Sequence, residues 1–172
     1  MVIKLANNCM YDMKIAGSRN SINEVVAIMN YKSLNCRMYR IFEAKVAEQE
    51  DDYAIISGDC AWSVDNCMIN VPDGATSLIQ LSKLFRLDFE VFSCEPGCAF
   101  QEHYVIQNGN IVCDECVDYQ EYWFNEDDWE GSTSEERFKN FCEEYDLNIT
   151  IDDLDGDVYV TGGLPNYCEW EI

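Results

Sequence analysis

The chain has 172 residues and carries 33 acidic against 11 basic side chains, for a formal net charge of −22. Proteins bind nucleic-acid phosphates and anionic membrane surfaces mainly through Lys and Arg, so this balance argues against direct binding to either. Hydrophobic residues make up 48% of the chain, too many for a disordered acidic tail, and we expect one folded domain or one domain with an appendage.

The charge is distributed unevenly along the chain. Residues 1–50 hold seven basic and five acidic side chains, whereas residues 51–172 hold four basic and 28 acidic ones. Because self-repulsion of this size destabilises a compact state, we expect the acidic part to bring some other benefit.

The first eight residues lack the apolar core of a secretory signal, and no apolar run approaches the roughly 20 residues of a membrane helix. We therefore expect a cytoplasmic protein. Its ten cysteines are predicted to be reduced thiols, most of them acting as small core residues.

The first half of the chain predicts three strands and a helix. Residues 5–16 are permissive for a strand. Ser21 and Glu24 have the spacing of a capping box and precede apolar residues at helical spacing, which predicts a helix. Residues 39–47 and 53–57 then form a predicted hairpin.

The second half continues with a capping box at Ser77 and Gln80, followed by a short predicted strand at residues 88–93. Residues 105–112 contain the clearest local signal in the chain. They place Asn108-Gly109 between β-rich flanks, which favours a type I′ turn and a hairpin.

A third capping box, Ser132 and Glu135, predicts an acidic helix, and residues 157–161 predict a last short strand. The resulting order predicts an α+β fold with a ferredoxin-like split βαβ antiparallel sheet and helices on one face. A hairpin and the acidic C-terminal helix would extend this sheet. We predict a domain at residues 1–122 and an acidic extension at residues 123–172 packed on it.

Several segments resemble the YubB-type ferredoxin-like proteins of phages and plasmids. The resemblance covers about residues 5–122 and implies a ferredoxin-like fold and an origin in a mobile element, but no catalytic residues. It is carried by Ala6-Asn7-Asn8-Cys9, Met13-Lys14-Ile15-Ala16-Gly17, Ile22, residues 77–87, 89–92 and 95–97, Phe100-Gln101-Glu102-His103-Tyr104, and Asn108-Gly109.

Four cysteines flank the predicted hairpin with spacings seen in zinc sites: Cys94, Cys98, Cys113 and Cys116. A regular hairpin closed by Asn108-Gly109 would place Cys113 opposite Tyr104 and Cys116 opposite Gln101. Cys98 would lie about 10 Å further along the strand, and Cys113 and Cys116 would point to opposite faces. A shared zinc site would need a bulge or a fold-back, so buried or surface thiols are the favoured interpretation, and zinc binding by these cysteines stays open.

His103 is the only histidine and a conceivable general base for a small hydrolase or a metal-dependent enzyme that also uses nearby carboxylates. No nucleophile motif accompanies it, so a hydrogen-bonded strand histidine is the favoured interpretation.

The acidic run at residues 152–157 fails the EF-hand register, because Gly156 at loop position 6 would put Ile151 and Gly162 at positions 1 and 12. Gly-rich phosphate-binding signatures are absent from the sequence. We predict no catalytic residue, metal or cofactor.

Residues 114–136 combine ten acidic side chains with five aromatic ones, and aromatic residues supply binding energy at protein interfaces. We predict a partner-binding face over residues 114–157, with Tyr119, Tyr122, Trp123 and Trp129 as anchors. Its acidic members are Asp114, Glu115, Asp118, Glu121, Glu126, Asp127, Asp128, Glu130, Glu135, Glu136, Asp152, Asp153, Asp155 and Asp157.

The hypothesis that follows is an inhibitor encoded by a mobile element. It would occupy the basic surface of a host nucleic-acid-binding defence protein, such as a CRISPR effector nuclease or a restriction enzyme, as a nucleic-acid mimic. Two alternatives remain: the enzyme that uses His103, and a non-catalytic regulatory module whose acidity only serves solubility. The sequence leaves the oligomeric state open.

Overall fold

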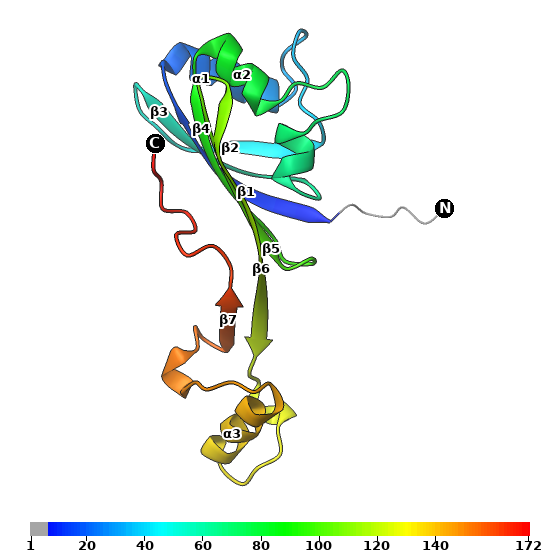
Figure 1. Cartoon of the computed structure of the whole chain (residues 1–172), viewed down its shortest axis with the longest axis vertical. Coiled ribbons are helices and arrows are strands. Elements are labelled where there is room, and N and C mark those ends of the chain that lie inside the picture. The colour runs from blue at the N-terminus through cyan, green and yellow to red at the C-terminus, as the bar shows by residue number, and fades with distance from the viewer. Residues whose placement is uncertain (1–6) are drawn as a thin grey trace, which may run out of the picture. The chain divides into compact units, whose positions relative to one another are not determined.

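The computed structural model describes residues 7–172 and divides them into two compact units (Figure 1). Unit 1 contains residues 7–118 together with Gly163–Ile172, and unit 2 contains Tyr119–Gly162. The predicted division after residue 122 lies four residues beyond this boundary, and the sequence did not indicate that the last segment returns to unit 1. Residues 5 and 6 of the first predicted strand lie outside the described residues.

Unit 1 follows the predicted order of strands and helices. Its elements are β1 (Asn8–Ala16), α1 (Arg19–Met29), β2 (Ile41–Gln49), β3 (Tyr53–Ala61), a π-helical turn η1 (Asp65–Ile69), α2 (Leu78–Phe85), β4 (Asp88–Glu95), β5 (Phe100–Gln107) and the first part of β6 (Asn110–Trp123). None of the helices found in residues 7–172 has the length and apolarity needed to span a lipid bilayer.

The strands pair antiparallel in the order β2-β3-β1-β4-β5-β6, and β7 (Val158–Gly162) pairs with the last residues of β6 inside unit 2. The chain is therefore an α+β protein with a seven-stranded open antiparallel sheet. This confirms the predicted class, but the sheet is larger than the four strands of a split βαβ unit.

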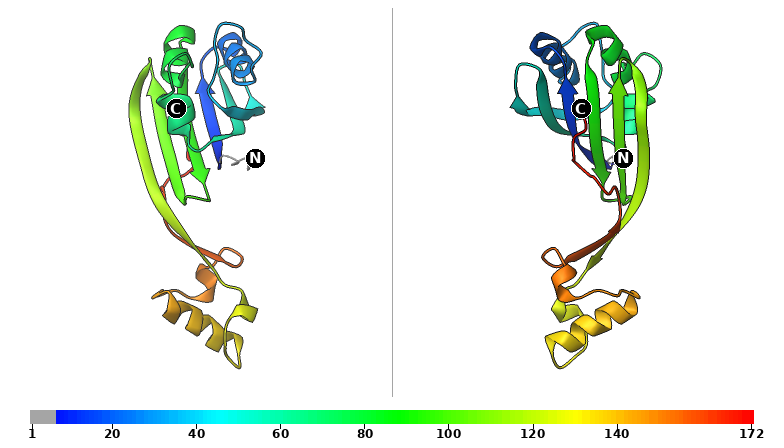
Figure 2. Two further views of the ribbon diagram at one scale, coloured as in Figure 1. Left: turned by 90° about the vertical axis from the view of Figure 1, so that its right-hand side faces the viewer. Right: turned by 60° about the vertical axis from the view of Figure 1, so that its left-hand side comes forward.

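The main core lies between one face of the sheet and helices α1 and α2 (Figure 2). Along β1 every second residue is buried, including Met13 and Ile15, as expected for a strand with one face on a core. Leu81 of α2 and Val25 of α1 are fully buried in the same cluster. Burial of these apolar stripes, rather than helix propensity alone, stabilises the two short helices.

The helix starts follow the predicted chemistry with small shifts. The α2 capping box is confirmed, since Ser77 Oγ accepts from the Gln80 amide and the Gln80 side chain accepts from the Ser77 amide. Helix α1 begins earlier than predicted, because Ser18 is its N-cap and accepts a hydrogen bond from the Ser21 amide. The predicted cap at Ser21 is therefore wrong, since that residue lies inside the first turn.

The hairpin of β5 and β6 contains an irregularity that the sequence did not reveal. Gln107 faces Asn110 as predicted, but the register shifts between Ile106 and Val105. Cys113 therefore lies opposite Val105 instead of Tyr104, and Cys116 lies opposite Glu102 instead of Gln101. A β-bulge of this kind rotates every later residue of the strand to the other face of the sheet.

The face of the sheet away from the helices is covered within unit 1 by the C-terminal segment, residues 163–172 (Figure 2). The rings of Tyr167 and Trp170 pack edge-on against buried Phe92 of β4, at centroid distances of 5.5 and 5.4 Å. The backbone amide of Leu164 donates to the Gln101 side chain on β5 at 2.8 Å.

Unit 2 has a small aromatic core of its own around Phe141, which is fully buried. The rings that pack against Phe141 belong to Phe124, Trp129, Phe138 and Tyr145. Besides β7, the elements of this unit are the short 3-10 helices η2 (Glu126–Asp128) and η3 (Ile151–Asp153) and the helix α3 (Ser134–Glu144).

Helix α3 starts one residue later than predicted. Thr133 is the N-cap and accepts from the Glu136 amide, and the Glu136 side chain accepts from the Ser132 amide. The predicted capping box at Ser132 and Glu135 is thus wrong by one position, because Thr133 offers an equivalent hydroxyl and Glu136 completes the box.

We expect Phe141→Ala to unfold unit 2 and leave unit 1 folded, because loss of a buried Phe costs about 3–5 kcal/mol and this core is small. Amide hydrogen exchange should become fast across Ser134–Glu144 and stay slow in β1 and β4. The control is Ile151→Ala, whose side chain is 55% exposed and should change little. Equal loss of protection in both units would contradict two separate cores.

Candidate functional site

Unit 2 is strongly acidic, and all of its carboxylates lie on the surface. Its 44 residues carry 14 acidic and two basic side chains, for a formal net charge of −12, and every one of the 14 is exposed. The two basic residues form ion pairs, Arg137 with Glu126 at 3.2 Å and Lys139 with Glu143 at 3.3 Å.

Most of the predicted acidic contact residues belong to this unit. The structure brings eleven of them together there: Glu121, Glu126, Asp127, Asp128, Glu130, Glu135, Glu136, Asp152, Asp153, Asp155 and Asp157. Asp114, Glu115 and Asp118 are also exposed, but they lie on β6 in unit 1. Three exposed acidic residues of unit 2 were missed, namely Glu143, Glu144 and Asp146, and a charge count extended along the third predicted helix would have found them.

The predicted aromatic anchors separate into structural and exposed residues. Tyr119 is only 7% exposed, and the partly buried Trp129 packs on Phe141 and Tyr145 in the core of unit 2. Tyr122 is half-buried against other tyrosine rings. Trp123, in contrast, is 64% exposed, and its indole N–H donates to Glu121 at 3.2 Å.

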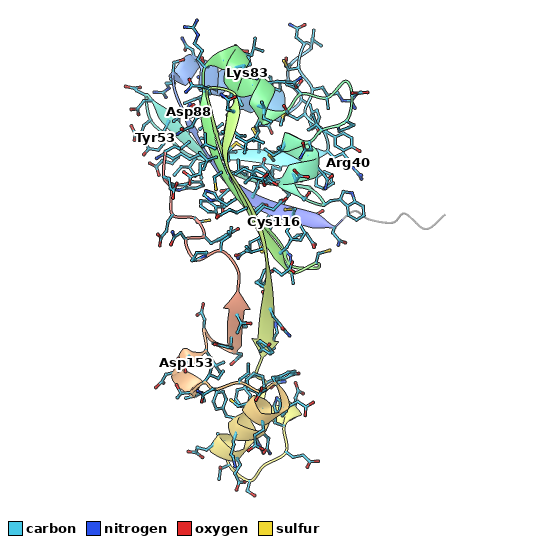
Figure 3. All side chains as sticks on the ribbon, in the orientation of Figure 1. Arg40, Tyr53, Lys83, Asp88, Cys116 and Asp153 are labelled. Carbon is cyan, nitrogen blue, oxygen red and sulfur yellow. The ribbon has the colours of Figure 1, made fainter. Side chains whose placement is uncertain are left out.

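Asp153 illustrates how local backbone geometry keeps a carboxylate of unit 2 charged (Figure 3). It caps η3 by accepting from the backbone amide and the hydroxyl of Thr150, at 2.7 and 2.8 Å. These hydrogen bonds lower the pKa of Asp153 below its usual value, because they favour the ionised form.

A second group of functional side chains lies in unit 1, on the sheet face that the C-terminal segment covers. We call Glu90, His103, Cys113 and Glu115 the histidine cluster; they come from three neighbouring strands. His103 Nε2 lies 3.0 Å from Oε1 of Glu90, whose side chain is fully buried. The imidazole stacks on Phe92 with a centroid distance of 4.1 Å and an interplanar angle of 1°.

The other oxygen of Glu90 holds the end of the chain. It accepts hydrogen bonds from the backbone amides of Glu171 and Ile172 at 2.6 and 3.1 Å. Lys14 Nζ of β1 also donates to the carbonyl oxygen of Ile172. A buried carboxylate is costly unless it is paired, and here His103 and two amides supply its partners.

The second nitrogen of His103 faces the remaining members of the cluster. His103 Nδ1 lies 3.5 Å from Cys113 Sγ and 3.5 Å from Glu115 Oε2. A cavity of about 210 Å³ adjoins these three residues and is also lined by Phe92 and Glu171.

Cys113, His103 and Glu90 contact one another in the order nucleophile, base and orienting carboxylate, as in a catalytic triad. The electrostatics do not support that role. Burial and the charges of Glu115 and Glu171 raise the pKa of the Cys113 thiol, so the reactive thiolate is disfavoured at neutral pH. His103 occupies the hydrogen-bonded strand position that the sequence favoured.

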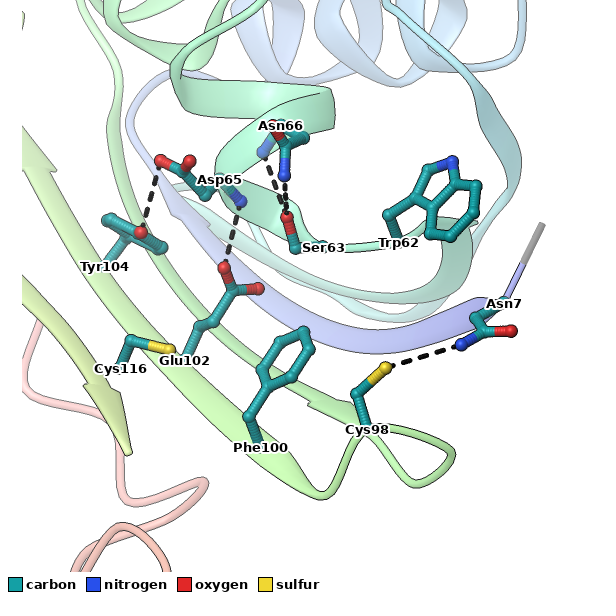
Figure 4. A pocket seen from close by; sticks show the side chains of 10 residues that line it. All are labelled: Asn7, Trp62, Ser63, Asp65, Asn66, Cys98, Phe100, Glu102, Tyr104 and Cys116. Atoms are coloured by element: carbon teal, nitrogen blue, oxygen red, sulfur yellow. Dashed lines mark hydrogen bonds between the residues drawn. The ribbon is translucent and has the colours of Figure 1, made fainter. Parts of the chain in front are cut away.

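The four cysteines that flank the hairpin do not converge. Cys113 lies in the histidine cluster, whereas Cys98 and Cys116 line a different cavity, so Cys113 and Cys116 point to opposite faces as predicted. Cys98 Sγ accepts a hydrogen bond from the Asn7 side chain at 3.4 Å (Figure 4).

This second cavity has a volume of about 360 Å³ and contains the buried Glu102 (Figure 4). The Glu102 carboxylate accepts from the backbone amides of Val64 and Asp65 at 2.8 and 3.2 Å and from Ser93 Oγ at 2.6 Å. Burial raises the pKa of Glu102, while these three donors favour its charged form. With three donors on two oxygens, its role is to hold η1 against β5.

Comparisons with protein-family models, curated proteins and solved structures found no match to the chain. Function is therefore inferred from the chemistry of these residues.

We expect Glu102→Gln to destabilise the chain by about 1–3 kcal/mol, because the amide NH₂ would face backbone or hydroxyl donors in a buried site. Urea unfolding monitored by circular dichroism measures the change. Asp114→Asn, an exposed neutralisation on the neighbouring strand, is the control and should stay within about 0.5 kcal/mol. Equal stability of Glu102→Gln and the unmodified chain would refute this role.

We also expect Glu90→Ala to release the C-terminal segment, because the amides of Glu171 and Ile172 lose their acceptor. Their hydrogen exchange should accelerate at least about 10-fold, which corresponds to 1.4 kcal/mol. Glu169→Ala, an exposed change in the same segment, should leave both rates unaltered. Lys14→Met, which removes the other hold on Ile172, should act in the same direction as Glu90→Ala. Unchanged exchange in both test variants would contradict this attachment.

Proposed function

We propose that unit 2 binds the basic nucleic-acid-binding surface of another protein and competes with nucleic acid for it. One observation carries the proposal: all 14 carboxylates of a 44-residue folded unit are exposed, with two basic side chains among them. On an ordinary protein surface acidic and basic side chains are interspersed, whereas in unit 2 the acidic side chains outnumber the basic ones 14 to two.

The electrostatic reasoning is that of a polyanion on a folded scaffold. Duplex DNA carries one phosphate per about 1.7 Å of helix axis, and proteins that bind it present grooves of Lys and Arg. A dense set of carboxylates is attracted to the same grooves, and complementary fields raise association rates.

The placement of charge on α3 supports a role beyond solubility. Glu143 and Glu144 lie at the C-terminal end of the helix, where the negative end of the helix dipole disfavours acidic side chains. Lys139 forms an ion pair with Glu143, whereas Glu144 has no such basic partner among the ion pairs of α3. Exposed Trp123 adds an apolar contact beside Glu121, in the manner of an interface hot spot.

The class of partner follows from the resemblance to YubB-type proteins of phages and plasmids. For a mobile-element protein, a host defence nuclease such as a CRISPR effector or a restriction enzyme is a target with a strongly basic channel. The encounter would take place in the cytoplasm of the bacterial host.

The same resemblance implies a ferredoxin-like core, and we propose this arrangement for β1 to β4 with α1 and α2. The strand order β2-β3-β1-β4, with every neighbour antiparallel, supports it.

The proposal predicts that the immobilised chain captures nucleic-acid-binding proteins from bacterial lysate at low salt, and that added DNA duplex releases them. A variant with five neutralised carboxylates of unit 2 should bind at least about 5-fold more weakly, since each exposed charge pair contributes about 0.2–1 kcal/mol. The changes are Asp127→Asn, Glu130→Gln, Glu144→Gln, Asp152→Asn and Asp155→Asn.

The matched control removes the same number of exposed charges from unit 1: Glu24→Gln, Glu50→Gln, Asp52→Asn, Asp73→Asn and Glu169→Gln. It should bind like the unmodified chain, and binding should weaken as salt is raised. The proposal is refuted if added DNA does not release the captured proteins, or if both variants lose the same binding affinity.

A further inference from the structure

We propose that His103, Cys113 and Glu115 bind a zinc ion. Within residues 7–172 these three side chains form the one group of at least three His, Cys, Asp or Glu residues whose ligand atoms converge, all within 4.8 Å of one another. The inference concerns unit 1 and does not depend on the function proposed for unit 2.

Both distances from His103 match those that a tetrahedral zinc ion requires, and the three ligand atoms all lie within 4.8 Å of one another. Zinc bonds of about 2.0–2.1 Å to nitrogen, about 2.3 Å to sulfur and about 2.0–2.2 Å to oxygen place neighbouring ligand atoms roughly 3.3–3.6 Å apart. His103 Nδ1 lies 3.5 Å from Cys113 Sγ and 3.5 Å from Glu115 Oε2. An ion beside His103 Nδ1 could therefore be bound by both neighbours once Cys113 and Glu115 close to bonding distance of it.

Glu90 prepares His103 for this role. Zinc-binding histidines usually donate their other ring N–H to a carboxylate, which fixes the tautomer and the orientation of the ring. Here Glu90 is fully buried and lies 3.0 Å from Nε2, so a proton on Nε2 leaves the lone pair of Nδ1 free for the metal. Stacking on Phe92 holds the plane of the ring.

The ligand types select the metal. One imidazole nitrogen, one thiolate and one carboxylate suit borderline ions such as Zn²⁺, whereas Ca²⁺ and Mg²⁺ prefer oxygen ligands alone. Glu90 and Glu171 add negative charge beside the three ligands, which favours a divalent cation at the site.

Three protein ligands leave one position of a tetrahedral ion open. The three ligands themselves line the cavity of about 210 Å³, so this position faces a space bordered by Leu164, Asn166 and Glu171 of the C-terminal segment. Three ligands plus an open position is the arrangement of catalytic rather than structural zinc sites.

The test is a titration of the reduced, chelator-treated full chain with Co²⁺ as a spectroscopic probe, followed by displacement with Zn²⁺. We expect one Co²⁺ per chain and a thiolate-to-cobalt charge-transfer band, which Cys113→Ser abolishes. Glu115→Ala changes an exposed side chain, so the fold should survive while affinity falls at least about 10-fold. Glu90→Gln should lower affinity about 10–100-fold by releasing the histidine.

The matched controls are Cys116→Ser on the same strand and Cys98→Ser, both exposed in the unmodified chain. Each should retain the band and the affinity. The proposal is overturned if the unmodified chain binds no Co²⁺, if the band persists in Cys113→Ser, or if the control cysteines matter as much as Cys113. Circular dichroism of each variant establishes that a lost band is not lost folding.

Discussion

The buried carboxylate of Glu90 is the constraint on which much of unit 1 depends. Helices α1 and α2 cover one face of the sheet, and a carboxyl group with no exposed surface on the other face is unfavourable unless hydrogen-bond partners surround it. His103 Nε2 lies 3.0 Å from one of its oxygens, and the amides of Glu171 and Ile172 donate to the other. Glu90 therefore both requires the C-terminal segment to cover this face and binds that segment through its last two amides. The contact of Glu90 with Nε2 also orients the ring of His103.

The β-bulge between β5 and β6 decides what His103 meets. In a regular hairpin Cys113 would lie opposite Tyr104, whose side chain belongs to the core under the helices. The register shift pairs Cys113 with Val105 and Glu115 with His103, which brings both onto the face of Glu90. One additional residue in β6 thus places the sulfur of Cys113 and the carboxylate of Glu115 beside the imidazole of His103. Bulges commonly redirect side chains in this way near functional sites.

Local signals predicted the elements well, because they act over a few residues. The Ser77 capping box and the Asn108-Gly109 turn satisfy backbone groups or set backbone twist without help from the rest of the chain. The bulge and the return of residues 163–172 depend on packing between segments distant in sequence, and no local pattern encodes them.

The exposure of the aromatic residues of unit 2 could not be predicted from local patterns either. Exposure of the acidic side chains could be expected from their charge, but only the packing around Phe141 makes Trp129 structural and leaves Trp123 exposed.

The two units use carboxylates in opposite ways. In unit 1, Glu90 and Glu102 are buried, and each accepts hydrogen bonds from the protein that hold a defined arrangement. In unit 2 all 14 carboxylates face outward, and the two basic residues neutralise few of them. Mutual repulsion opposes this arrangement, as does the dipole of α3 at Glu143 and Glu144, while a small cluster of aromatic rings holds the unit together. A basic partner surface would relieve that repulsion, since it supplies from outside the positive charge that the unit itself lacks.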